Sequence, residues 1–135
     1  MGTGVEYSSQ TENSTKQRVL IVEDELFIAL DLEETVKAMG FDVAGLANGR
    51  DQALQLARDA DIAFVDVNLS DGPTGPEIGR RLVEEFGVTV VFMTGNPEAV
   101  ADKLNGALGV VTKPAMPSTV QRTLRKAAEL RRGLN

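Results

Sequence analysis

Polar side chains able to do chemistry stand at the ends of apolar runs in this sequence. Asp66 directly follows the apolar residues 63–65. Unbroken apolar runs with β-branched and aromatic residues are typical of strands buried on both faces of a parallel sheet. In open α/β sheets, ligands and reacting groups gather at the carboxyl ends of the strands. We therefore expect Asp66 to be a reacting group, with the chemistry of an aspartate nucleophile.

Other polar residues lie at or beside the ends of apolar runs: Glu23, Asp24, Thr94 and Lys113. The ends of parallel strands lie at one edge of a sheet, so these side chains are expected to converge around Asp66. Three carboxylates without histidine make a hard oxygen site suited to Mg²⁺. A phosphoryl group moving to Asp66 needs such a metal, together with donors such as the Lys113 ammonium and the Thr94 hydroxyl.

Each of these residues also has an ordinary structural explanation. A carboxylate after a strand often only marks a helix N-terminus or a turn. A threonine at a strand end is commonly a cap, and a lysine is usually a solvated surface charge. The set as a whole, at successive strand ends, favours a functional site.

Length and composition limit the class of protein. The 135 residues suffice for one domain, and the net charge of −6 argues against direct nucleic-acid binding. Apolar stretches fall short of the roughly 20 residues that cross a bilayer, so we expect no membrane partner and a cytoplasmic location. The sequence has no cysteine and no histidine, which leaves acid–base and metal chemistry to carboxylates, hydroxyls and lysine.

The apolar pattern predicts strands that alternate with helices. Residues 1–17 are polar and aperiodic, and we expect a disordered tail there. Five strands are expected, over 18–22, 42–46, 63–66, 88–94 and 109–112. Five helices are expected, over 26–39, 51–58, 77–86, 97–104 and 117–130, with Leu26, Phe27 and Leu30 on the apolar face of the first. Residues 68–76, rich in glycine and proline, are expected to be irregular. This alternation indicates an α/β fold with a doubly wound parallel sheet.

These motifs resemble the receiver domains of two-component response regulators. The run Val19-Leu20-Ile21-Val22-Glu23-Asp24-Glu25 is similar to the family's first strand and acidic pair, and Thr112-Lys113-Pro114 to its lysine–proline motif. The resemblance places the receiver domain over residues 18–132, with 133–135 as a short C-terminal end. It implies a flavodoxin-like sheet of five parallel strands in the order 2-1-3-4-5, with five helices.

The resemblance also implies a role for each residue. Asp66 would accept a phosphoryl group from a sensor histidine kinase, Lys113 would contact that group, and Thr94 would be the switch hydroxyl. Mg²⁺ would be held by Glu23, Asp24, Asp66 and the backbone carbonyl of Asn68. The Lys113–Pro114 peptide would be cis. The protein would then be a phosphoacceptor rather than an enzyme.

A finer resemblance concerns the partner kinase. Phe92-Met93-Thr94-Gly95 is similar to the Phe-x-Thr-Gly motif of single-domain receivers that pair with kinases of the HWE or related class. Two positions depart from common receiver patterns. Val110 stands where the last strand usually has an aromatic residue, and Asn96-Pro97 stands where this branch often has an aromatic residue just after the motif. The expectation is a single-domain regulator that signals to an unidentified partner protein, or that acts as a phosphate shuttle or sink.

Three alternatives stay open on sequence alone. An aspartyl-nucleophile phosphatase would use Asp66, although its usual acid two positions later is Asn68 here. A flavin-binding module is disfavoured because the first strand is followed by Glu23 and Asp24, which would repel phosphate. The chain could also be a receiver excised from a longer hybrid kinase or regulator.

Overall fold

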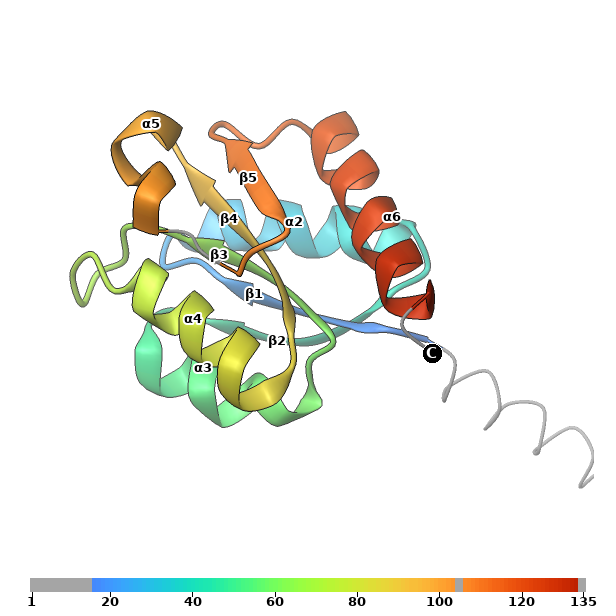
Figure 1. The fold of residues 1–135 in the computed structure, drawn as a ribbon. Coiled ribbons are helices and arrows are strands. Elements are labelled where there is room, and N and C mark those ends of the chain that lie inside the picture. Colours follow the sequence, from blue (N-terminus) through green and yellow to red (C-terminus); the bar gives the residue numbers. More distant parts are fainter. Residues whose placement is uncertain (1–15, 104–105, 134–135) are drawn as a thin grey trace, which may run out of the picture.

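Five parallel strands form the centre of the structure, a computed structural model that describes residues 16–103 and 106–133 (Figure 1). The strands are β1 (Arg18–Val22), β2 (Asp42–Ala47), β3 (Ile62–Asp66), β4 (Thr89–Thr94) and β5 (Gly109–Thr112). Their spatial order is β2-β1-β3-β4-β5, which confirms the predicted flavodoxin-like sheet. The predicted tail, residues 1–17, lies outside the described residues except for its last two.

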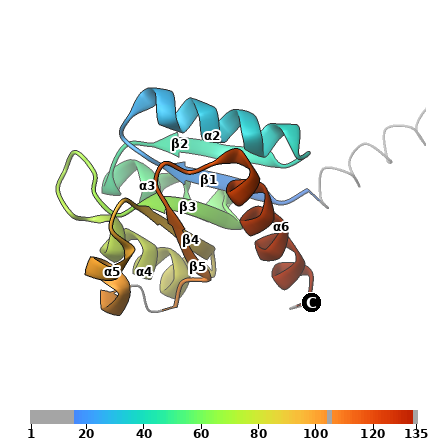
Figure 2. The same ribbon diagram turned by 90° about the horizontal axis from the view of Figure 1, so that it is seen from above.

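Helices cover both faces of this sheet. They are α2 (Leu26–Ala38), α3 (Arg50–Leu56), α4 (Gly75–Phe86), α5 (Pro97–Val100) and α6 (Pro117–Gly133), with short 3₁₀ turns η1 (Ala57–Asp59) and η2 (Ala101–Lys103). Figure 1 and the view from above in Figure 2 show α3 and α4 together on one face, and α2 and α6 on the other. Within the described ranges, no helix has the length and apolar character needed to cross a bilayer.

Alternate residues of each central strand enter different halves of the core. In β1, Leu20 and Val22 pack in the cluster beneath α3 and α4, whereas Val19 and Ile21 pack in the cluster beneath α2 and α6. All four side chains are fully buried. Side chains of a strand point alternately to its two sides, so a strand covered on both faces must be apolar at every position. This explains the unbroken apolar runs that end at the polar residues.

Helix α4 begins earlier than its glycine and proline content suggested. The prediction that residues 68–76 are irregular is wrong at its end, because Gly75 and Pro76 form the first turn of α4. Proline is favoured in a first helical turn, where its missing N–H is no loss. A Cβ on Gly75 would overlap the backbone of Asp66 and Val67. Glycine therefore lets α4 start directly against the end of β3.

The predicted apolar face of α2 needs correction. Leu26, Phe27 and Leu30 are exposed, with Phe27 at 82%, and the residues that meet the sheet are Ala29, Leu32 and Val36. Residues 26–30 are all apolar, so their pattern left the orientation of the first turns ambiguous. The helix predicted over 97–104 is also broken, into α5 and η2, and residue 104 lies outside the described residues.

Candidate functional site

The ends of four strands bring together the polar residues singled out in the sequence. Lys113, after β5, places its Nζ 2.9 Å from Asp66 Oδ2 at the end of β3. The same Nζ lies 3.3 Å from Glu23 Oε1, just beyond β1. Glu23 and Asp66 are only 3% and 4% exposed, and these contacts join residues 90 and 47 positions apart. The sheet topology alone makes such residues neighbours.

Backbone groups fix the orientation of both buried carboxylates. Glu23 Oε2 accepts the backbone N–H of Glu25 at 3.1 Å, and Asp66 Oδ1 accepts the backbone N–H of Asn68 at 3.1 Å. The N–H of Glu23 itself donates to Ala47 O at the end of β2, at 2.9 Å. The carboxylates are thus held in place before any ligand arrives, which lowers the cost of binding one.

The charges in this cluster do not balance. Burial raises the pKa of Glu23 to about 7, and the negative charge of Asp66 adds to the rise while Lys113 opposes it. Burial alone would lower the pKa of Lys113, but its hydrogen bonds and ion pairs with Asp66 and Glu23 outweigh this effect and raise the pKa. Two buried carboxylates thus share one ammonium group, and the cluster can accommodate further positive charge.

The donor set fits a hard divalent cation. Ligand oxygens of Glu23, Asp24 and Asp66 lie within 4.8 Å of one another, and Asp24 is the least buried of the three. Mg²⁺ prefers a few carboxylates and keeps several waters, so a cluster with one solvent-facing side suits it. Asn68 follows on the same loop with its N–H bonded to Asp66, which brings the Asn68 backbone beside the cluster.

Thr94 lies at the end of β4, next to the lysine that contacts the carboxylates. Its side chain is buried and its carbonyl oxygen accepts the backbone N–H of Lys113 at 2.9 Å. The Thr94 Oγ1 accepts the N–H of Asn96 at 3.1 Å. Asn96 precedes α5 at its N-cap position, but its side chain makes no capping hydrogen bond. The Lys113–Pro114 peptide is cis, as the resemblance implied.

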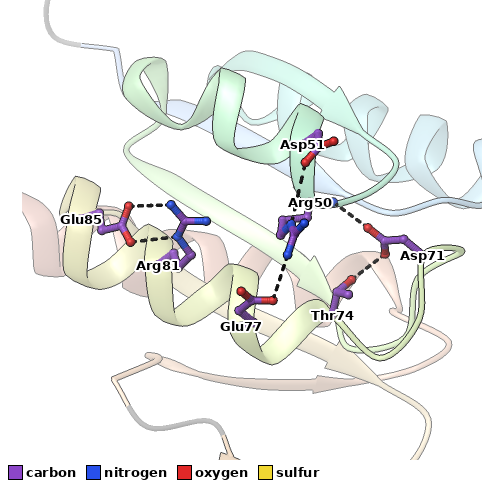
Figure 3. A network of polar contacts seen from close by, with 7 residues as sticks. All are labelled: Arg50, Asp51, Asp71, Thr74, Glu77, Arg81 and Glu85. Atoms are coloured by element: carbon purple, nitrogen blue, oxygen red, sulfur yellow. Dashed lines mark hydrogen bonds and ion pairs between the residues drawn. The ribbon is translucent and has the colours of Figure 1, made fainter.

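One carboxylate near this site was missed in the sequence. Asp71, in the loop between β3 and α4, accepts hydrogen bonds from the backbone N–H of Arg50 and from the Thr74 hydroxyl (Figure 3). Its Asp-Gly dipeptide signals only a turn. A contact with a residue 21 positions earlier leaves no local or periodic mark, so sequence patterns could not reveal it.

Comparison with known proteins assigns the fold to a family. Residues 19–125 match the family described as the response regulator receiver domain. The chain belongs to this family. Receiver domains are the phosphoacceptors of two-component systems and partner with histidine kinases. This membership confirms the family resemblance and favours a phosphoacceptor over the phosphatase and flavin-binding alternatives.

Two curated relatives illustrate the similarity. The chain is 32% identical over 114 residues to the phyllosphere-induced regulator PhyR of Methylorubrum extorquens, covering 81% of this chain and 42% of PhyR. It is 31% identical over 125 residues to the DNA-binding response regulator MtrA of Mycobacterium tuberculosis, covering 89% of this chain and 53% of MtrA. The chain therefore spans about half the length of the curated relatives it matches.

Solved structures agree with this assignment. The receiver domain of Erythrobacter litoralis PhyR is 34% identical, with a TM-score of 0.75 over 83% of this chain and 89% of that domain. The response regulator PhyR of Brucella abortus is 28% identical, with a TM-score of 0.78 over 93% of this chain and 54% of that protein. The shared region is thus the receiver part of these regulators.

Proposed function

We propose that this receiver domain is a phosphorylation-controlled switch in which Asp66 is the phosphoacceptor. The observation that carries the proposal is the buried pairing of Asp66 with Lys113 and Glu23 at the strand ends, in a chain that belongs to the receiver family. Glu23, Asp24, Asp66 and the backbone carbonyl of Asn68 would hold Mg²⁺. The domain would act in the cytoplasm, where it would meet the phosphohistidine of the kinase. It would signal to a partner protein, pass the phosphoryl group on, or serve as a sink for it.

The chain's own residues would each contribute to the transfer. An oxygen of the Asp66 carboxylate forms the new bond to phosphorus as the bond between phosphorus and the kinase histidine nitrogen breaks. Lys113, already 2.9 Å from Asp66 Oδ2, would move its ammonium onto an oxygen of the arriving phosphoryl group. The bound cation would neutralise charge on the phosphoryl oxygens. Burial of the Glu23 and Asp66 carboxylates strengthens these interactions.

Thr94 would report the new charge to the rest of the domain. Its hydroxyl donates to no described acceptor but accepts the N–H of Asn96, and its carbonyl accepts the N–H of Lys113. Turning this hydroxyl toward a phosphoryl oxygen would release Asn96 and shift the segment that leads into α5. A change in local charge that biases a two-state element is the general form of such switches.

The proposed partner is a sensor histidine kinase, and the Phe92-Met93-Thr94-Gly95 segment supports a kinase of the HWE class. The relatives named PhyR support a further step. One solved relative, PhyR of Bartonella quintana, is described as an anti-anti-sigma factor. A partner in sigma-factor control is therefore a downstream candidate for a longer protein or pathway that contains this domain.

Phosphoryl uptake by the wild type and by Asp66→Asn tests the proposal. Both proteins are incubated with Mg²⁺ and acetyl phosphate, and separately with a phosphorylated HWE kinase, and the phosphoprotein is counted by intact-mass spectrometry. Asp59→Asn, which makes the same change at an exposed carboxylate before β3 and leaves the four ligands, Thr94 and Lys113 untouched, is the control for a general effect of substitution. Uptake by the wild type and the control but not by Asp66→Asn supports the proposal. Equal uptake by Asp66→Asn would show that Asp66 is not the acceptor.

A further inference from the structure

A charged side chain ties the loop after Asp66 to the start of α3 (Figure 3). Asp71 Oδ2 accepts the backbone N–H of Arg50, the first residue of α3, at 3.0 Å. Asp71 Oδ1 accepts the Thr74 hydroxyl at 2.6 Å. The hydrogen bond from Thr74, and then that from Arg50, hold the pKa of Asp71 below its ordinary value. The carboxylate is thus charged at neutral pH, and it links two loops at the same edge of the sheet.

Gly49 leaves space for the Asp71 carboxylate because it has no side chain. The backbone of Gly49 is extended, with φ at −175°, a conformation open to any residue. A Cβ there would nevertheless lie 2.9 Å from Asp71 Oδ2, closer than ordinary contact. The position of Asp71, rather than the backbone conformation, therefore disfavours a side chain at residue 49.

The loop held by Asp71 is closed on itself at two further points. Leu69 and Gly72 exchange backbone hydrogen bonds of 3.0 and 2.9 Å, and Gly75 N–H donates to Val67 O at 3.1 Å. The Leu69 side chain is buried in the core beneath α3 and α4. Asn68 lies between these closures, in the same loop that Asp71 ties to the start of α3.

The corner between β2 and α3, residues 47–50, supports both segments of the acidic site. At one end Ala47 O accepts the N–H of Glu23, and at the other Arg50 N–H donates to Asp71. One segment carries the Glu23–Asp24 pair, and the other carries Asp66 and Asn68. The corner therefore sets the distance between the two sets of oxygens.

We propose that Asp71 is a positioning residue for the phosphoryl-transfer site: its bond to Arg50 N–H sets the Asn68 backbone relative to Glu23 and Asp24. This inference rests on the proposed function and names a further residue that controls it. Residues that orient metal ligands from outside the ligand set commonly change metal affinity by about 10- to 100-fold when they are removed. Loss of the Asp71 contact should lower Mg²⁺ affinity about tenfold.

A double-mutant cycle tests this inference. The variants are Asp71→Ala, which removes the acceptor, Gly49→Ala, which displaces it, and the two combined. Asp51→Ala is the matched control, because Asp51 pairs with the Arg50 side chain at 3.8 Å, not with the Arg50 backbone N–H that Asp71 accepts, and is 90% exposed. Mg²⁺ affinity is measured by amide NMR titration, and phosphate uptake from acetyl phosphate by intact mass. Amide spectra without Mg²⁺ establish that each variant is folded.

The expected pattern is non-additive. Asp71→Ala and Gly49→Ala should each weaken Mg²⁺ binding about tenfold, the double variant should be no weaker than the singles, and Asp51→Ala should match the wild type. Wild-type affinity in Asp71→Ala, or additive losses in the double variant, would overturn the inference while leaving the proposed function intact. A wild type that neither binds Mg²⁺ nor takes up phosphate would refute the proposed function, and this inference with it.

Discussion

The raised pKa of Glu23 makes a quantitative prediction about stability. The folded-state value of about 7 lies above the ordinary 4.5, because the buried carboxylate lies beside Asp66. The folded protein therefore binds the proton of the Glu23 carboxyl group more tightly than the unfolded chain does. The resulting stabilisation is complete below about pH 4.5 and is lost as pH rises through about 7. At about 1.4 kcal/mol for each pKa unit, the loss reaches about 3 kcal/mol near pH 8.

Glu23→Gln should therefore stabilise the metal-free protein at high pH. Glutamine is uncharged at all these pH values and keeps an oxygen to accept the N–H of Glu25. Urea unfolding in the presence of a chelator, followed by circular dichroism, gives the free energy of unfolding. We expect the variant to exceed the wild type by up to about 3 kcal/mol near pH 8, and to match it near pH 4.5.

Glu25→Gln is the matched control. It removes one carboxylate from the same segment, but Glu25 is exposed, so the stability difference from the wild type should stay within about 0.5 kcal/mol at either pH. Added Mg²⁺ should reduce the difference near pH 8, because it binds the folded wild type more tightly than Glu23→Gln. A metal-free Glu23→Gln that is less stable than the wild type near pH 8 would refute the electrostatic reasoning.

Four further predictions concern the core, the lysine and the switch. Leu82→Ala, at a fully buried site, should lower the free energy of urea unfolding by about 2 to 5 kcal/mol, whereas Leu26→Ala, at an exposed one, should change it by less than about 0.5 kcal/mol. Gly75→Ala should cost about 1 to 3 kcal/mol in the same assay, because its Cβ meets the backbone of β3. Lys113→Met should raise the pKa of Glu23 further in a carboxyl NMR titration, since Lys113 lowers it; an unchanged value would contradict the ion pair. Thr94→Ala should take up phosphate but lose the amide shifts in the segment leading to α5; wild-type shifts would rule out the switch role.

The strands and the meeting of the polar residues were predictable because both follow from short-range patterns. A central strand buried on two faces must be apolar throughout, so its end is marked by the first polar residue, as at Asp66. Once the strands are parallel, their ends share an edge. The neighbourhood of Lys113 and Glu23 then follows from topology, although their 3.3 Å contact does not.

The sequence predictions were wrong where the local pattern was ambiguous, or where the deciding contact joins residues far apart in the sequence. Five successive apolar residues in α2 define no single face, so the pattern wrongly places Phe27 on the buried face although it is exposed. The sequence pattern predicts a loop at Gly75, because the need for glycine there comes from the backbone at the end of β3, which contacts it only in the fold. The Asp71–Arg50 bond likewise depends on two corners meeting in space.

The central claim, that Asp66, Thr94 and Lys113 form one phosphoryl site, is tested most directly by amide NMR with Mg²⁺ and beryllofluoride, which mimics a phosphoryl group on aspartate. We expect the largest shifts at these three residues and in the adjoining loops, with none of comparable size at the opposite edge of the sheet. Beryllofluoride added to Asp66→Asn in the same Mg²⁺ buffer should leave its spectrum unchanged. Shifts in the wild type that are absent or centred elsewhere would contradict the account.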